Sequence, residues 1–393
     1  MRDVVIVAGC RTPIGTIGGQ FKTLAPVELT IPVMQNLIKR AGIDPVIIDD
    51  VIWGCNYQRT YKENNLARVA AVKAGLPVTV PGITIHRNCT SSMSAIQMGF
   101  YQIRAGEAEC IMAGGSDSMS TAPHMVFNAR YGQKYGHMEM RDSMWDSLTN
   151  LGVGPAMGIT AENVADKYGI TREQMDAYSL RSQQRAVAAI DAGRFEEEII
   201  PVTVKTRKSE TTYTVDEYPK RNATLEGLQK LKPAFKEGGK VTAGNASGMN
   251  DASSGVILMS EEKAKELGCP IMAKVVSVAT TGVEPELMGI GPISSTKKAL
   301  EKAGLTVDDI DLFEINEAFS SQCLACQKEL GVPDEKLNVN GGGISLGHPV
   351  GATGSRIVIT LMYELKRRKQ RYGVATLCAG GGMGTTVVIE MCE

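Results

Sequence analysis

Residues 83–115 read ITIHRNCTSSMSAIQMGFYQIRAGEAECIMAGG, and this stretch decides the class of fold. Residues 83–88 predict a strand, residues 92–106 predict a helix, and residues 109–115 predict a buried strand that breaks into glycines. Strand, helix and strand in this order form the repeating unit of a layered sheet whose faces are covered by helices. The sequence therefore predicts an α/β fold.

The same alternation continues on both sides of this stretch. Residues 3–9 and 49–55 predict strands, with a helix over residues 26–41 between them. Strands and helices alternate again from about residue 255 to residue 391. The strands within 109–120 and 374–386 both break into glycine-rich turns, which indicates an internal duplication. We therefore expect two similar α/β halves stacked as layers, with the active site between them.

The middle of the chain differs from both halves. Residues 121–248 contain many Met, Gly and charged residues and have weaker apolar runs. Helices are predicted at 161–169 and 172–193, the second with Thr171 as its N-cap and Gly193 as its stop. We interpret this region as an inserted cap. The predicted organisation is an N-terminal half over residues 1–120 completed by 249–272, a cap over 121–248, and a C-terminal half over 273–393.

Composition narrows the classes of function. The 393 residues are 43% hydrophobic, and the formal net charge of −1 provides no global basic field for nucleic acid. The apolar run at residues 4–8 is too short for a signal peptide or a membrane span, so we expect a cytoplasmic protein. The nine scattered cysteines favour free thiols. Cys323 and Cys326 form a CxxC in a predicted helix, where buried thiols are favoured over a zinc or redox site; no metal is predicted.

Cys89 is the first candidate for chemistry. It lies where the predicted strand gives way to a helix that begins near Ser91. The positive end of a helix dipole lowers the pKa of a thiol, which makes a cysteine nucleophilic without strong neighbouring cations. The alternative is a structural thiol.

Three further residues occupy positions suited to catalysis. His348 lies in a glycine-rich loop with no following Lys of a phosphate-binding loop, and is predicted to act as a general base or an oxyanion donor. Cys378 ends a predicted strand before AGGGMG, which suits either a proton shuttle, with backbone N–H groups of the turn binding an oxyanion, or a buried structural thiol. Asn316 follows another strand and is a candidate N-cap or a residue that holds a catalytic water.

Together these segments resemble the thiolase family over nearly the whole chain, and most closely its short-chain acetyl-CoA acetyltransferases. The resemblance implies a duplicated, layered α/β/α/β/α fold with an inserted cap. The last four motifs, in their order, are highly specific. The matching segments are RTPIG (11–15), the segment at Cys89, TAENVA (160–165), KLKPAF (230–235), VTAGNASGMNDAS (241–253), NEAF (316–319), NxNGGGISLGHPxGATG (338–354) and CAGGGMG (378–384).

The resemblance implies a role for each candidate. Cys89 is acylated by a thioester after activation by His348. Cys378 removes a proton from the α-carbon of a second acetyl-CoA, or returns it during cleavage. One oxyanion hole consists of His348 and a water held by Asn316, and the other of the N–H groups of Cys89 and Gly380. Two holes are needed because an enolate and a tetrahedral oxyanion form at different thioesters.

Coenzyme A, as a substrate rather than a cofactor, is expected to lie across the cap. The resemblance places Ser247 at the pantetheine arm and Met157 at the acyl end. Lys220 and Arg221 are expected near the adenine and its phosphates, or else belong to a solvated loop. A homodimer or homotetramer is implied, with no nucleic-acid or membrane partner. The other expected coenzyme A contacts are Ala243, Gly244, Phe235, Ala318 and Phe319.

Three departures from the family pattern leave the acyl substrate open. Ser92 replaces a glycine, His86 a residue that is usually Asn, and Ala156 a histidine. A thiolase for longer, branched or aromatic 3-oxoacyl-CoA is therefore an alternative. A second alternative is an idle or partner-dependent subunit, against which the intact catalytic side chains argue. A third, a β-ketoacyl synthase, is disfavoured by Cys378.

Overall fold

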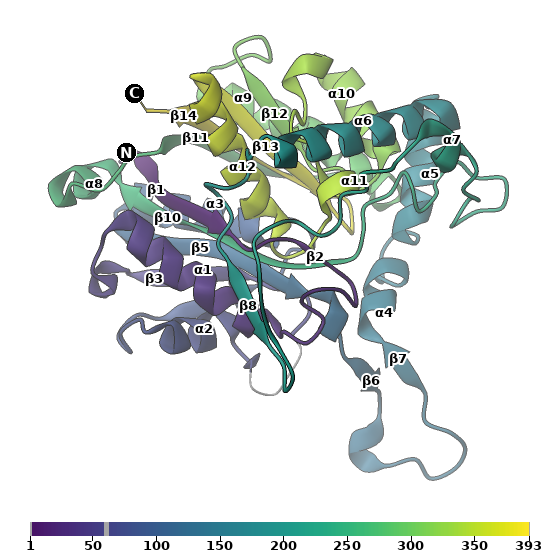
Figure 1. Ribbon diagram of the computed structural model, residues 1–393, viewed down its shortest axis with the longest axis horizontal. Coiled ribbons are helices and arrows are strands. Elements are labelled where there is room, and N and C mark those ends of the chain that lie inside the picture. The colour runs from purple at the N-terminus through teal and green to yellow at the C-terminus, as the bar shows by residue number, and fades with distance from the viewer. Residues whose placement is uncertain (1, 59–62, 393) are drawn as a thin grey trace.

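The computed structural model describes residues 2–58 and 63–392, and its centre is one large mixed sheet (Figure 1). The strand order is β12-β13-β14-β11-β1-β10-β5-β3-β4, with β2 paired to β10. The strands of this sheet are β1 (Val4–Arg11), β2 (Gly15–Thr16), β3 (Asp50–Gly54), β4 (Gly82–Ile85), β5 (Cys110–Ser118), β10 (Asn250–Ser260), β11 (Ala273–Gly282), β12 (Leu312–Ile315), β13 (Tyr372–Ala379) and β14 (Met383–Met391).

The helices divide between the two halves and the segment that connects them. Those of the halves are α1 (Pro26–Ala41), α2 (Leu66–Ala74), α3 (Ser91–Ala105), α8 (Glu261–Leu267), α9 (Gly291–Ala303), α10 (Ser320–Leu330), α11 (Gly343–Leu346) and α12 (Thr353–Arg368). The middle of the chain contributes β6 (His124–Val126), β7 (Met140–Asp142), α4 (Ser143–Thr149), α5 (Met157–Lys167), α6 (Arg172–Asp191), β8 (Val202–Lys205), β9 (Glu210–Tyr213) and α7 (Leu225–Gln229).

The sheet consists of two halves joined by a short seam. Strands β1 and β11 pair only through Val5 with Lys274 and Ile6 with Ala273. Helices α3 and α12 contact each other and strands of both halves, so they form a central layer. Helices α1 and α2 cover the outer face of one half, and α9 packs on the other (Figure 1). The result is the expected α/β/α/β/α layering.

The core explains why α3 and α12 are buried. Met93 and Ile96 of α3 pack with Ile357 and Leu361 of α12 in one apolar cluster, which also includes Leu377 of β13. A helix that is apolar on most sides is stable only inside a protein. Both helices begin beside the candidate catalytic residues, so the buried layer supports the site.

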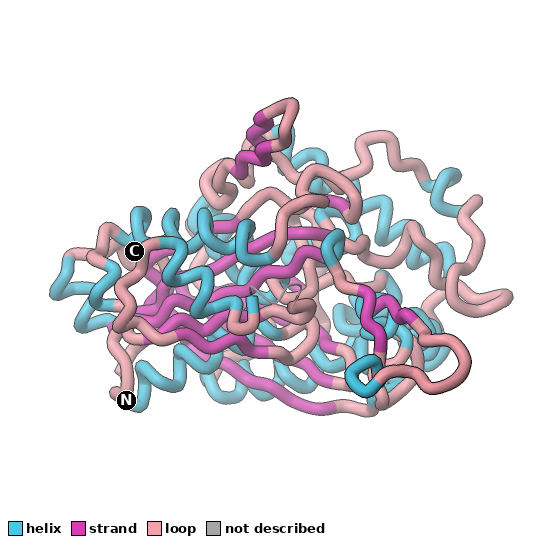
Figure 2. Tube along the Cα trace, turned by 90° about the horizontal axis from the view of Figure 1, so that it is seen from below, coloured by secondary structure: helices cyan, strands magenta, loops and turns pink. Residues whose placement is uncertain are grey.

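The middle segment extends away from the sheet. Strands β6 and β7 pair to form an arm that projects from the body of the molecule in both views (Figures 1 and 2). Helices α5 and α6 instead pack against α10 and α11 of the C-terminal half. In the described part of the chain, no helix is long and apolar enough to span a membrane.

Several predicted elements agree with the structure, and one differs. Helix α1 spans residues 26–41 as predicted, and Thr171 caps α6 by accepting a hydrogen bond from the Gln174 N–H. The strand predicted over 83–88 ends at Ile85. Asn88, within the predicted strand, has a positive φ of 46°, which an extended strand does not accommodate.

Candidate active site

Cys89 lies in a sharp turn between β4 and α3. The left-handed conformation of Asn88 reverses the chain, and the Asn88 carbonyl accepts hydrogen bonds from the Ser91 hydroxyl at 2.7 Å and the Ser91 N–H at 3.1 Å. The Asn88 side chain donates to the Gly380 carbonyl at 2.8 Å, which ties this turn to the one after β13. Local turn chemistry therefore presents Cys89 at the start of α3, facing the C-terminal half.

The electrostatics of Cys89 differ from the expectation of a lowered thiol pKa. Burial raises the pKa of the Cys89 thiol to about 11, and the negative charge of Asp117 adds to the rise. The N–H groups of Gly380 and of Cys89 itself act in the opposite direction. Removal of water from a thiolate outweighs the helix terminus here. Cys89 therefore rests as a neutral thiol, which could act as a nucleophile only with the help of a base.

His348 is buried and held at two points. Its backbone N–H donates to the Asn250 side chain at 2.9 Å, and its Nδ1 lies 2.7 Å from the Thr353 hydroxyl. That hydroxyl donates its single proton to the Pro349 carbonyl at 2.8 Å, so it accepts from Nδ1–H. Nε2 is therefore unprotonated and can accept a proton. Burial, with a smaller effect of Arg356, lowers the pKa of His348 to about 3, and the ring is neutral.

Asn316 lies beside the basic nitrogen of His348. Its Nδ2 is 3.5 Å from His348 Nε2, and its backbone N–H donates to the Thr376 carbonyl at 3.0 Å. Its Oδ1 is buried without a protein partner, which is the environment in which an ordered water is held. Asn316 is not the N-cap of α10, a position that Phe319 occupies. The structure thus brings Asn316 and His348 together.

Cys378, one residue before the end of β13, lies beside the same site. Burial raises the pKa of its thiol well above the ordinary value, and the nearby Cys89 raises it further. Its apolar surroundings include Ala318, Phe319 and the partly buried Met157, all of which are expected to contact coenzyme A. The tertiary structure therefore brings Cys89, Cys378 and Gly380 into one site, although 289 residues separate the two cysteines in sequence (positions 89 and 378).

The other expected pantetheine contacts surround these residues. The Ser247 N–H donates to the Ala318 carbonyl at 2.9 Å. The rings of Phe235 and Phe319 meet edge to face at 6.4 Å, and a Cβ at Gly158 would lie 2.1 Å from the Phe235 ring. These contacts connect the cap to the C-terminal half through apolar surface suited to a flexible thiol-bearing arm.

The expected nucleotide contacts lie further along the cap. Lys220 and Arg221 are exposed and line a surface depression of about 260 Å³ beside α6. Arg221 pairs with Asp191 at 2.8 Å, while the Lys220 ammonium lies 5.5 Å from the Tyr218 ring centroid. Of the other predicted residues, Ala243 is exposed and Gly244 is half-buried.

The three departures from the family pattern have different surroundings. Ser92 is buried and its hydroxyl accepts the Ser355 N–H at 2.9 Å, so it joins α3 to α12 and faces away from the cap. His86 is exposed, with Nε2 2.9 Å from the Asn88 side-chain oxygen. Ala156 is the N-cap residue of α5, directly before Met157.

Sequence reasoning missed the residues that hold the catalytic loop in place. Asn250 and Thr353 fix His348, and Asp117 accepts the Gly351 N–H at 2.6 Å. Arg356, one turn into α12, is buried with its charge 3.7 Å from Glu314. Asn250 and Thr353 belong to motifs quoted above, but their partners were not evident because the contacts join segments far apart in sequence.

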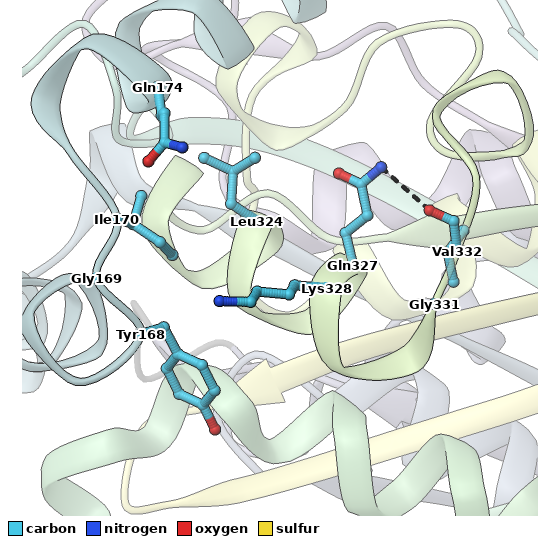
Figure 3. A pocket seen from close by; sticks show the side chains of 9 residues that line it. All are labelled: Tyr168, Gly169, Ile170, Gln174, Leu324, Gln327, Lys328, Gly331 and Val332. Carbon is cyan, nitrogen blue, oxygen red and sulfur yellow. Dashed lines mark hydrogen bonds between the residues drawn. The ribbon is translucent and has the colours of Figure 1, made fainter.

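A different depression lies between the α5–α6 turn and α10 (Figure 3). Its volume is about 410 Å³, and none of its lining residues belongs to the predicted site. The Gln327 side chain there donates to the Val332 carbonyl at 3.1 Å, so it is engaged within the protein. The lining residues are Tyr168, Gly169, Ile170, Gln174, Leu324, Gln327, Lys328, Gly331 and Val332.

Comparisons with known proteins agree with this geometry. The family model for the thiolase N-terminal domain matches residues 4–262, and that for the thiolase C-terminal domain matches residues 269–391. The chain therefore belongs to the thiolase family, and the β-ketoacyl synthase alternative falls away.

Individual relatives cover the whole chain. An acetyl-CoA acetyltransferase of Syntrophomonas wolfei is 50% identical over 99% of both chains, and one of Pseudomonas aeruginosa is 47% identical over the same share. The crystal structure of the Bacillus anthracis acetyl-CoA acetyltransferase is 48% identical and superposes with a TM-score of 0.98 over 100% of this chain and 99% of that one. Human mitochondrial 3-ketoacyl-CoA thiolase in complex with CoA is 43% identical, with a TM-score of 0.96 over 100% and 98% of the two chains.

Proposed function

We propose that this protein is an acyl-CoA C-acyltransferase that condenses two acetyl-CoA molecules to acetoacetyl-CoA, or cleaves 3-oxoacyl-CoA with CoA, through an acyl group on Cys89. The observations that carry the proposal are a Cys89 thiol of raised pKa at the start of α3 and a neutral His348 imidazole whose Nε2 is unprotonated. A thiol of high pKa and a base of low pKa react by transferring the proton as the sulfur attacks.

In the condensing direction the steps divide between the two cysteines. Cys89 Sγ forms a bond to the thioester carbon, its proton passes to His348, and the CoA thiolate leaves with the proton of the Cys378 thiol. The Cys378 thiolate then takes a proton from the α-carbon of the second acetyl-CoA. The resulting enolate attacks the acyl carbon, a carbon–carbon bond forms, and the Cys89 sulfur leaves and takes back the proton held by His348.

Two sets of donors would stabilise the charges that develop. The N–H groups of Cys89 and Gly380, which lower the pKa of the Cys89 thiol, are aimed at negative charge beside Sγ. His348 and a water held by Asn316 would serve the second thioester, and the unpartnered Asn316 Oδ1 supports this assignment. The proposal includes no cofactor, because CoA itself supplies the reactive thioester.

The cap, residues 121–248, would hold coenzyme A. Ser247, Met157, Ala243, Gly244, Phe235, Ala318 and Phe319 would contact the pantetheine arm and the acyl end, while Lys220 and Arg221 would lie near the nucleotide. Support comes from the cluster that joins Cys378 to Ala318, Phe319 and Met157. We also propose a cytoplasmic homodimer or homotetramer.

The test is a CoA-dependent cleavage assay with purified protein. Acetoacetyl-CoA and a longer or aromatic 3-oxoacyl-CoA are compared, with Cys89→Ala as the control. Turnover of acetoacetyl-CoA that is lost in Cys89→Ala is the expected result. Turnover of only the bulkier substrate would identify a specialised thiolase. A wild-type protein that turns over none of the substrates would contradict the proposal.

A further inference from the structure

Apolar side chains from four distant segments surround the Cys89 side chain. Tyr57, Met119 and Val350 form a small buried cluster, and the partly buried Cys89 and Met144 pack against it. Tyr57 follows β3, Met119 follows β5, Val350 is two residues after His348, and Met144 lies on α4. An acyl group attached to Cys89 must therefore fit against these side chains, and we call Tyr57, Met119, Met144 and Val350 the apolar wall.

Helix α4 is built by local hydrogen bonds and fixed to the wall by one more. Asp142 caps it by accepting the Met144 N–H at 2.9 Å, and the Ser147 hydroxyl donates to the Met144 carbonyl at 2.7 Å. The Tyr57 hydroxyl lies 2.7 Å from the Ser147 hydroxyl. Since the Ser147 proton is already used, Tyr57 is the donor. This bond holds α4, with Met144, against the cluster on which Cys89 also packs.

Leu151, two residues after α4, adds a second side of the wall. A Cβ at Gly380 would lie 2.8 Å from Leu151 Cδ1 and 3.3 Å from Met157 Sδ. The N–H of Gly380 is one of the two donors that act on the Cys89 sulfur. Leu151 therefore lies next to the place where the carbonyl of an acylated Cys89 would be bound.

We propose that Met144 and Leu151, held in place by the Tyr57–Ser147 hydrogen bond, restrict the acyl group that Cys89 accepts to short, unbranched chains. This inference rests on the proposed function and adds the substrate class. Trp145, the neighbour of Met144 on α4, is 62% exposed, so the helix turns only one face toward the nucleophile. The wall is thus an element at the surface that can be altered without repacking the sheet.

The cleavage reaction explains why the side chains around Cys89 would limit the chain length of the substrate. The Cys89 sulfur bonds to C3 of a 3-oxoacyl-CoA while its proton passes to His348. The C2–C3 bond then breaks, its electron pair stays on C2, and C2 takes a proton from Cys378. The acyl group left on Cys89 contains every carbon from C3 onward, so only this part changes with the length of the substrate. The thiol of a second CoA then releases it: its proton passes to the Cys378 thiolate, its sulfur bonds to the acyl carbon, and the Cys89 sulfur leaves and takes back the proton held by His348.

The test compares kcat/KM for acetoacetyl-CoA with that for 3-oxooctanoyl-CoA in wild type, Met144→Ala and Leu151→Ala. Each truncation removes several carbon-sized atoms, and a single methylene in an apolar pocket changes specificity about 10-fold or more. We therefore expect the ratio of long to short substrate to rise at least about 10-fold in each variant. Tyr57→Phe keeps the ring but releases α4, and should raise the ratio by a smaller factor. The matched control is Leu267→Ala at the end of α8, 42% exposed, which should leave the ratio at the wild-type value.

The outcomes separate this inference from the function on which it rests. The inference is overturned if wild type cleaves acetoacetyl-CoA but the ratio of long to short substrate is unchanged in both truncations and in Tyr57→Phe. The proposed function then still stands. Wild type that prefers the longer substrate also overturns the inference. Wild type that cleaves neither substrate overturns both. Intact-protein mass spectra provide a second readout, since acetyl-CoA should acylate wild type while hexanoyl-CoA, which carries the acyl group that 3-oxooctanoyl-CoA leaves on Cys89, should acylate only the truncated variants.

Discussion

At the scale of single residues, the site combines a thiol and an imidazole that are both uncharged at rest. Burial raises the pKa of Cys89 to about 11 and lowers that of His348 to about 3. A cysteine–histidine ion pair would require the opposite pKa shifts, a lowered pKa for the thiol and a raised pKa for the imidazole. The buried surroundings of both groups therefore favour proton transfer during attack on the thioester over a preformed thiolate.

The pH dependence of Cys89 alkylation tests this protonation state. Well below its pKa, the thiolate fraction of a thiol grows about tenfold for each pH unit, so the iodoacetamide rate at Cys89 should rise without a plateau from about pH 7 to pH 9. Peptide mass spectrometry measures alkylation of the peptide that contains Cys89. The Cys89→Ala variant shows how much alkylation occurs at other thiols, such as the partly exposed Cys269 and the exposed Cys392. A rate independent of pH in this range would mean that a thiolate is already present.

Thr353 is predicted to position His348 through Nδ1. Thr353→Val removes the acceptor that fixes the Nδ1–H tautomer, so kcat/KM for thioester cleavage should fall at least about tenfold. Thr353→Ser keeps the hydroxyl and should retain most of the activity. Equal losses in the two variants would indicate a packing role for this residue rather than a tautomeric one.

At the scale of elements, β5 supports the catalytic loop by backbone contact. A Cβ at Gly115 would lie 2.0 Å from the Gly351 carbonyl oxygen, while Asp117 on the same strand holds the Gly351 N–H. Only glycine permits this approach between the strand and the loop that carries His348.

Gly115→Ala should therefore displace the loop and disturb the site. We expect a loss of stability of about 1–3 kcal/mol, typical of overpacking, together with a marked fall in kcat. Gly9→Ala is the matched control, because a Cβ there meets only side-chain ends of Met362 and Ile359, at 3.1 and 3.3 Å. Denaturant unfolding and cleavage assays on both variants make the measurement; a fully active Gly115→Ala would contradict the argument.

At the scale of the whole molecule, the projecting arm and α4 expose large apolar side chains. Such a concentration on one protrusion is unusual for a monomer and typical of a contact between subunits. The exposed side chains are Met125, Val126, Phe127, Tyr131, Tyr135, Met138, Met140 and Trp145.

Light scattering at micromolar concentration tests the proposed oligomer. The measured mass should be two or four times the chain mass of 42.1 kDa. Replacement of Tyr131 and Tyr135, which are 91% and 94% exposed, by Ser should weaken association without loss of the folded state. A wild-type mass equal to one chain would contradict the oligomer while leaving the active-site chemistry untouched.

Features that depend on neighbouring residues could be predicted from the sequence. The bounds of α1, the cap of α6 and the start of α3 beside Cys89 follow from periodicity, capping and turn residues within a few positions. The family motifs likewise identified the layered fold and the candidate catalytic residues. The protonation of Cys89 and His348 depends instead on tertiary packing, because burial by distant segments sets their pKa values. Tertiary packing also decided what surrounds the nucleophile, because the apolar wall joins residues that lie far apart along the chain and meet only when the layers and the arm pack together.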